Sequence, residues 1–254
     1  ADARMLERHR TLNNTAYFQQ MNTRLQGVIQ KTLAHIAGGY DIQAATMKDI
    51  TDRWRAQLDA DIKQLVDAGI IVCIAAGNDN MKHDVLGGVD YNNDLVVTSF
   101  GTWNYHRGGS PNLNGEPGFN VGAISSSNTN AALNEKASFS DSGPATNIYT
   151  CGQNIIGAFP TTSNAYHYDV SFGQTKLSGT SMASPQMAGM AACLLQAHPD
   201  WTPRQVMTWF ESNATDTLFS TGATDDYTTT NSVHGGPAKV GFLPLKGQKP
   251  FGIN

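Results

Sequence analysis

Residues 179–185 read Gly-Thr-Ser-Met-Ala-Ser-Pro, and the small and apolar residues 186–195 that follow are typical of a buried helix. Ser181 is therefore expected where a tight loop, permitted by Gly179, turns into a helix. The first backbone N–H groups of a helix have no partner within it, and the positive end of the helix dipole lies beside them. A serine at this position is a candidate nucleophile, provided that a base lies next to it. The alternative is an ordinary helix cap rich in Gly and Ser.

An apolar run, Ile-Ile-Val-Cys-Ile-Ala-Ala, occupies residues 70–76 directly after Gly69. Such a run is typical of a strand that is covered on both faces in a parallel sheet. Apolar residues recur at helical spacing over residues 58–66, and Gly69 stands where that helix should end. A further helix is predicted from Thr202-Pro203, because threonine caps helices and proline favours their first position. This alternation of strands and helices predicts an α/β fold with helices packed on a parallel sheet.

Asn78 follows the predicted strand, at the edge of the sheet where α/β proteins bind ligands. Its amide and the Ser181 N–H could together hold the negative oxygen of a tetrahedral acyl-transfer intermediate. Taken alone, Gly-Asn after a strand is a common turn. Thr180 either supports the same site or simply caps the loop.

Three segments, in this order along the chain, resemble the subtilisin family of serine proteases. Residues 66–78 are similar to its buried strand and oxyanion asparagine, residues 121–124 with 137–143 to its next strand and turn, and residues 179–185 to its nucleophile motif. The resemblance implies a three-layer α/β fold with a mainly parallel sheet flanked by helices. It also implies a serine endopeptidase that hydrolyses peptide bonds through an acyl-enzyme on Ser181.

The same resemblance implies a groove for a peptide or protein substrate. Ala75, Ala76 and Gly77 on one side, and Gly38 and Gly39 on the other, would pair with an extended substrate backbone by strand addition. We expect a subtilisin-like domain over residues 1–212 and an extended tail or arm over residues 213–254. The long segment 80–120, rich in Gly and Asn, is expected to shape the groove or to contact a partner.

The family's aspartate and histidine motifs are not found in this sequence. Asp67-Ala68-Gly69 ends the helix that precedes the strand, and aligning His35 with the tail of the histidine motif would place Thr32 at the catalytic position. His9 lies in a charged segment without a following apolar helix face. Three other histidines lie between Asn78 and Ser181, out of the family's order: His83, His106 and His167.

Two explanations remain open at this point. In the first, the N-terminal strands of the fold are missing from this chain, and a retained N-terminal fragment or another chain supplies His and Asp. In the second, the domain is catalytically incomplete and serves as a structural component of a larger assembly such as a viral particle. The protein is accordingly expected to be either secreted or part of an assembled particle.

Composition excludes several other functions. The 17 Lys and Arg and 21 Asp and Glu residues give a net charge of −4, which is no footprint for nucleic acid. No apolar run approaches the length of a membrane span. No metal or cofactor is expected. Calcium is bound by several members of the family, but the candidate loop carboxylates are more often solvated turns: Asp79, Asp84, Asp90 and Asp94.

Overall fold

The computed structural model describes residues 44–92, 94–97, 101–104, 113, 115–125, 134–158, 167–169, 173–215, 218–219 and 232–243. The chain divides into two compact units, Ala1–Met47 and Lys48–Asn254, and the elements below belong to the second apart from the start of the first helix. The predicted substrate residues Gly38 and Gly39 lie outside the described residues, as do His9, His35 and His106. The predicted domain boundary at residue 212 stays a prediction.

The described helices are α3 (Ala44–Asp67), α4 (Thr180–Ala197) and α5 (Pro203–Asn213). The described strands are β1 (Cys73–Ala75), β2 (Asp94–Val97), β3 (Gly101–Asn104), β4 (Phe119–Ile124), β5 (Asn134–Glu135), β6 (Ile148–Cys151), β7 (Ile155–Ala158), β8 (His167–Asp169), β9 (Gln174–Leu177) and β10 (Leu218–Phe219).

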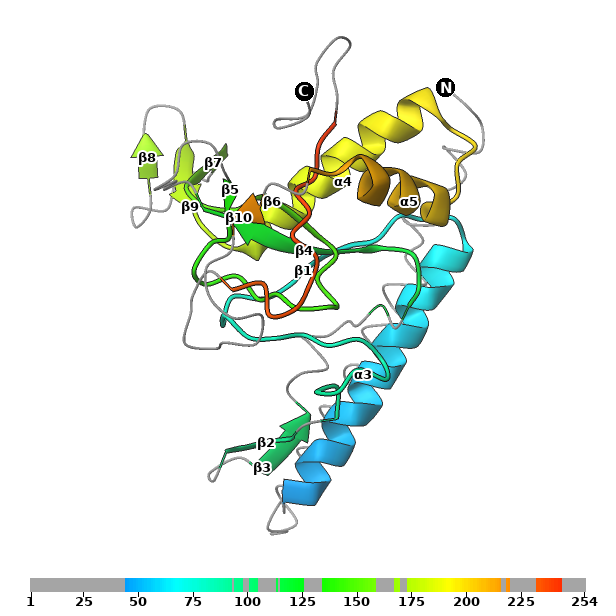
Figure 1. Ribbon diagram of the computed structural model, residues 1–254, viewed down its shortest axis with the longest axis vertical. Coiled ribbons are helices and arrows are strands. Elements are labelled where there is room, and N and C mark those ends of the chain that lie inside the picture. The colour runs from blue at the N-terminus through cyan, green and yellow to red at the C-terminus, as the bar shows by residue number, and fades with distance from the viewer. Residues whose placement is uncertain are drawn as a thin grey trace. The chain divides into compact units, whose positions relative to one another are not determined.

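A parallel sheet in the order β1-β4-β6 forms the centre of this unit, with Cys73 opposite Phe119 and Val121 opposite Ile148. Helix α4 packs against all three strands, and α5 packs against α4 (Figure 1). The remaining described strands form the antiparallel groups β2-β3 and β7-β9-β8 and the short parallel pair β5-β10. The predicted α/β fold with a mainly parallel sheet and flanking helices is confirmed.

The core lies between the sheet and these two helices. Alternate residues of β4 point into it, and α4 buries residues three or four apart, as the two periodicities require. Phe119 of β4 and Phe210 of α5 meet edge to face, with ring centroids 5.7 Å apart. The fully or nearly fully buried members of this cluster are Phe119, Val121, Ala123, Ala137, Ile148, Ala183, Met187, Ala191, Leu194, Val206 and Phe210.

The predicted end of α3 and the predicted start of α5 agree with those observed. Gly69 has a positive φ of 79°, and Ile70 donates to the carbonyl of Leu65, which closes the end of α3. Thr202 caps α5 in a reciprocal pair with Gln205. The strand predicted over residues 70–76 is regular only over β1, although Phe119 donates to the Val72 carbonyl and Ala76 donates to the Val121 carbonyl. The ladder therefore extends one residue beyond each end of the regular strand.

Part of the predicted C-terminal arm docks on the unit's own sheet. Tyr149 of β6 donates to the Lys239 carbonyl at 2.9 Å, and Gly241 donates to the Tyr149 carbonyl at 2.8 Å. Val240 lies in a second apolar cluster with Tyr149 and Ile124. Residues 232–243 thus satisfy backbone groups at the β6 edge of the sheet that would otherwise lack partners.

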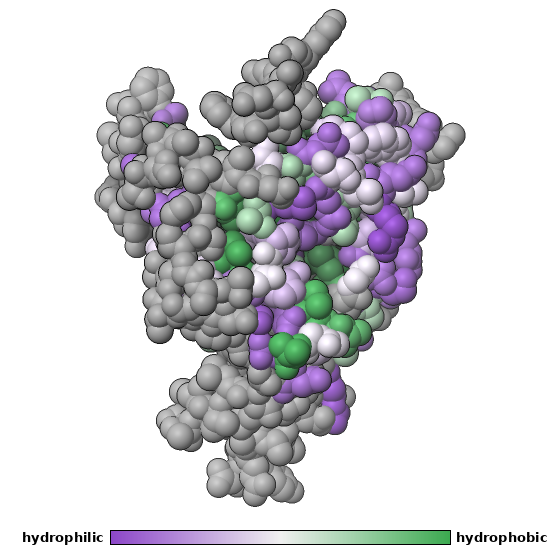
Figure 2. Space-filling model, viewed as in Figure 1, coloured by the Kyte–Doolittle hydropathy of each residue, from purple (hydrophilic) through white to green (hydrophobic). Residues whose placement is uncertain are grey.

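Three of the five large apolar residues that are exposed in the described part of the chain lie within residues 85–89. Figure 2 shows hydrophobic residues in small patches that are separated by hydrophilic ones. The exposed large apolar side chains of the described residues are Val85, Leu86, Val89, Ile156 and Leu177. Within the described part of the chain, no helix has the length and apolar character needed to cross a membrane.

Replacing Phe210 by alanine should lower the free energy of unfolding by about 3–5 kcal/mol, because it opens a cavity against Phe119. Thr208→Ala, an exposed position of the same helix, is the matched control and should change it by no more than about 0.5 kcal/mol. Denaturant unfolding of the full chain measures both. Equal effects of the two substitutions would contradict the assignment of Phe210 to the core.

Candidate active site

Ser181 is the second residue of α4 and is exposed. The preceding Gly179 has φ 155° and ψ 159°, a backbone conformation that is essentially restricted to glycine. Its N–H donates to the Gly152 carbonyl at 2.8 Å, which fixes the loop to the residue that follows β6. The sequence therefore bends sharply at Gly179 and presents the Ser181 side chain at the start of the helix.

Asn78 is held directly beside this turn by Thr180. The Thr180 N–H and hydroxyl both donate to Asn78 Oδ1, at 2.9 and 3.1 Å. The Gly77 N–H donates to Thr180 Oγ1 at 3.1 Å. Because the amide oxygen of Asn78 receives both bonds, its NH₂ group is the end that remains available to a ligand, and the residue is exposed.

Two donors therefore lie at the start of α4. One is the Asn78 NH₂ group, and the other is the Ser181 N–H, which belongs to the first turn and has no acceptor within the helix. The helix dipole adds positive potential at the same place. Donors fixed in this way can stabilise an oxygen that becomes negative during acyl transfer.

The sequence left two roles open for Thr180, and the structure shows where its side chain lies. It is completely buried between Gly77 and Asn78 and contacts both. Its hydroxyl therefore braces the loop that follows β1 and does not merely cap α4.

The predicted substrate-binding residues 75–77 differ in which of their backbone groups are already bonded within the protein. Ala75 ends β1, which is at the edge of the described sheet, and the Ala76 N–H donates to Val121 of β4. Gly77 donates to Thr180, and its carbonyl accepts from the Asp141 N–H at 3.0 Å. Its N–H and carbonyl are thus both used within the protein, as is the Ala76 N–H, so strand addition stays a prediction for Ala75 above all.

A buried polar cluster lies beneath the Asn78 loop. Asp141 Oδ1 accepts the N–H groups of Asp79 and Met81 at 2.9 and 2.8 Å, and Asp141 Oδ2 lies 3.2 Å from His83 Nε2. Asp141 and His83 are each only 2 % exposed. In the sequence, Asp141 stands out only as part of the segment 137–143, which resembles a turn of the family. Nothing in its spacing indicated a contact with His83.

Lys136 is the cation of this cluster and is fully buried. Its Nζ donates to Asn80 Oδ1 at 2.9 Å and to the Ser140 carbonyl at 2.6 Å. Burial lowers the pKa of Lys136 from 10.5 to about 8, even though the nearby Asp141 carboxylate acts in the opposite direction.

The histidines whose side chains are described have partners other than Ser181. His83 is buried against Asp141, and His234 is buried with Nδ1 2.7 Å from Ser142 Oγ. His198 follows the far end of α4, about 26 Å along the helix axis from Ser181, and stacks on Trp201.

Asp84 and Asp90, two of the calcium candidates, are engaged in closing their own loop. The two oxygens of Asp84 accept the N–H groups of Val85 and Asp90, each at 2.8 Å, and Asp90 forms an ion pair with Lys82 at 2.6 Å. Among the described residues, no three His, Cys, Asp or Glu side chains gather in a way that could hold a metal ion.

One face of α4 is open. Its exposed residues recur every three to four positions from Ser181 onward, so they share one side of the helix. All but Gln196 are small or are proline, and they are Ser181, Pro185, Ala188, Gly189, Ala192, Cys193, Gln196 and Ala197. We call this set the open face of α4.

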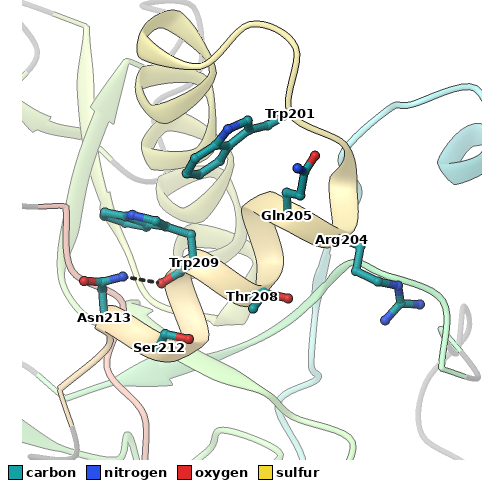
Figure 3. Close-up of a pocket in the computed structure, with 7 residues that line it drawn as sticks. All are labelled: Trp201, Arg204, Gln205, Thr208, Trp209, Ser212 and Asn213. Atoms are coloured by element: carbon teal, nitrogen blue, oxygen red, sulfur yellow. Dashed lines mark hydrogen bonds between the residues drawn. The ribbon is translucent and has the colours of Figure 1, made fainter.

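A pocket of about 410 Å³ lies on α5 and contains none of these residues (Figure 3). Figure 3 shows the rings of Trp201 and Trp209 on one side and the Arg204 side chain pointing away from them. Its lining residues are Trp201, Arg204, Gln205, Thr208, Trp209, Ser212 and Asn213.

Thr180→Val keeps the shape of the side chain but removes the hydroxyl, which leaves the Gly77 N–H without its acceptor. It should cost about 1–3 kcal/mol of stability, whereas Thr180→Ser retains the hydroxyl and should cost less. Denaturant unfolding measures both variants. Equal stabilities would show that the hydroxyl does not hold this loop.

The pKa of Lys136 predicts a pH dependence of stability. Between about pH 8 and 10.5 Lys136 of the unfolded chain retains a proton that the folded chain has lost, so the contribution of Lys136 to the free energy of unfolding should rise with pH, by about 3 kcal/mol in total. Lys136→Met removes this contribution. The raised pKa of Cys73, about 12, acts in both proteins and cancels in the comparison.

Unfolding of the wild type and Lys136→Met at several pH values therefore gives a direct test. The wild type should gain stability relative to the variant as the pH rises above 8. A difference between the two that does not vary with pH would contradict the lowered pKa.

Comparisons with known proteins identify the family of this chain. The model of the subtilase family, peptidase S8, matches residues 16–235. Subtilisin-like protease 4 of Arthroderma benhamiae is 30% identical over 198 residues, which cover 78% of this chain and 36% of that protein. Subtilisin E of Bacillus subtilis is 31% identical over 160 residues, or 61% of this chain and 31% of that protein.

Among solved structures, that of a cold-adapted subtilisin-like serine proteinase matches with a TM-score of 0.48 and 23% identity, over 74% of this chain and 50% of that one. The chain spans about a third of the length of the two curated relatives above. Since the family model covers most of the sequence, including both Asn78 and Ser181, the chain belongs to the subtilase family.

Proposed function

We propose that this chain provides the nucleophile and the oxyanion hole of a subtilisin-like serine endopeptidase, with the histidine base and its aspartate supplied from outside the chain. The observation that carries the proposal is the pair of hydrogen bonds from Thr180 to Asn78 Oδ1. They engage the Asn78 oxygen, so the NH₂ group is the end of the amide that a ligand at the start of α4, beside Ser181, could use.

In the proposed reaction, Ser181 Oγ attacks the carbonyl carbon of the substrate peptide bond while the base takes its proton. The carbonyl oxygen becomes negative and accepts bonds from the Asn78 NH₂ group and the Ser181 N–H. The base then protonates the departing amine, which leaves the acyl group on Ser181. Water, deprotonated by the same base, releases the acid and restores the hydroxyl.

The open face of α4 supports an external source for the base. It begins at Ser181 and consists mainly of small residues, so a second helix packed on it could approach closely and bring a side chain to Ser181 Oγ. The histidines whose side chains are described are all engaged elsewhere. An N-terminal fragment or another chain is the proposed occupant of this face.

A peptide or protein substrate fits the same place. The strand β1 ends at Ala75, next to Asn78, and lies at the edge of the described sheet. An extended peptide that pairs with this edge would carry its backbone past Asn78 toward Ser181.

Ser181→Ala tests the proposal. Protein isolated from its source, with any chain that remains bound, is treated with a fluorophosphonate probe, and the adduct is located by peptide mass spectrometry. We expect an adduct on Ser181 that is lost in Ser181→Ala. Ser184→Ala is the matched control and should keep the adduct, because Ser184 Oγ is bonded to the Cys73 carbonyl at 3.1 Å.

Absence of an adduct on correctly folded wild-type protein would count against the endopeptidase. It would favour instead the alternative of a catalytically incomplete subtilase domain that serves as a structural component of a larger assembly.

A further inference from the structure

We propose that Asp141 is a positioning residue for the oxyanion hole: its buried carboxylate holds the loop 77–81 so that Asn78 faces Ser181. This inference rests on the proposed function, because it assigns a role within the same site. Asp141 does not touch the reacting atoms, and its effect is exerted through Asn78.

Asp141 bonds to the loop on both sides of Asn78 along the chain. Before Asn78, the Gly77 carbonyl accepts the Asp141 N–H at 3.0 Å. After Asn78, the N–H groups of Asp79 and Met81 donate to Asp141 Oδ1 at 2.9 and 2.8 Å. One residue on a distant segment thus fixes three of the four other residues of the loop.

The Asp141 carboxylate packs so closely against Gly77 that no side chain fits at this position. Gly77 has a positive φ of 119°, and a Cβ at this position would overlap Asp141 Oδ2. The carboxylate therefore occupies the space that a side chain would fill. Glycine directly before Asn78 is required both by its backbone conformation and by the carboxylate beneath it.

The remaining loop residue and the remaining carboxylate oxygen are also bound. Lys136 Nζ donates to Asn80 Oδ1, and Asn80 has a positive φ of 54°. Asp141 Oδ2 lies 3.2 Å from His83 Nε2. His83 Nδ1 is itself buried and has no hydrogen-bond partner, so the ring meets the cluster through Nε2 alone.

Together these contacts hold Asn78 from two directions. Thr180 fixes its amide oxygen from the start of α4, while Asp141 fixes the backbone of the residues on either side of it, Gly77 and Asp79. Bonds to an ionised acceptor are stronger than those to a neutral one, so a carboxylate suits this position. Loss of the carboxylate should let the loop shift and move the Asn78 NH₂ group away from the oxyanion.

The test is a double-mutant cycle that measures the rate of fluorophosphonate labelling of Ser181 in the source complex. Asp141→Ala should slow labelling about 10- to 100-fold, the effect of a displacement of a catalytic group by about 1 Å. Asn78→Ala alone should slow it by about 10²–10³, a magnitude taken from the loss of such an asparagine in a subtilisin. In the Asn78→Ala background, Asp141→Ala should have little further effect.

Two further variants separate positioning from general destabilisation. Asp141→Asn keeps an oxygen that can accept both loop N–H groups but loses the charge, so it should slow labelling less than Asp141→Ala does. Ser142→Ala removes a neighbouring buried hydroxyl that bonds to the Ser232 carbonyl, and its effect should be the same with or without Asn78. Equal slowing by Asp141→Ala in both backgrounds would overturn the proposal.

Amide hydrogen exchange gives a readout that does not depend on activity. In Asp141→Ala, the N–H groups of Asp79 and Met81 should exchange at least about tenfold faster, while those of β4 keep their protection. Unchanged exchange at Asp79 and Met81, or an equal rise throughout the chain, would overturn the role of Asp141. A wild type that is never labelled, with the exchange result as expected, would refute the endopeptidase and leave the loop contact established.

Discussion

The hydrogen bonds between Thr180 and Asn78 join two segments that lie about a hundred residues apart, the end of β1 and the start of α4. The rest of the site depends on this junction. It orients the amide of Asn78, it gives the Gly77 N–H its acceptor, and it sets the distance between the loop and the exposed Ser181. Because α4 packs on all three strands of the central sheet, the junction is built on the most buried part of the unit.

Buried charged residues next to this junction hold the loop 77–81 in place. Asp141, Lys136 and His83 are all nearly or completely buried, and each contacts another member of the cluster or the loop 77–81. Buried charges are tolerated only when paired and hydrogen-bonded, and here the partners are mainly backbone groups next to Asn78. The loop is thus fixed while Ser181 itself remains accessible.

The sequence predicted the end of α3, β1, α4 and the start of α5, and it singled out Asn78 and Ser181. These follow from local patterns: an apolar run, glycines at turns, a capping threonine and the segment around Ser181. It did not predict the pairing of His83 with Asp141 or the burial of Lys136. These contacts join ordinary residue types across more than fifty positions, with no periodicity that would mark them. The open face of α4 was equally hidden, because small apolar residues such as Ala188 and Ala192 are typical of a helix that is buried all round.

The most direct test of the central claim is a crystal structure of the protein, isolated with any bound chain, after reaction of Ser181 with a fluorophosphonate. We predict that the phosphonyl oxygen accepts hydrogen bonds from both the Asn78 NH₂ group and the Ser181 N–H, with the Thr180–Asn78 bonds intact. An adduct whose oxygen points away from Asn78 would contradict the assignment of this junction as an oxyanion hole.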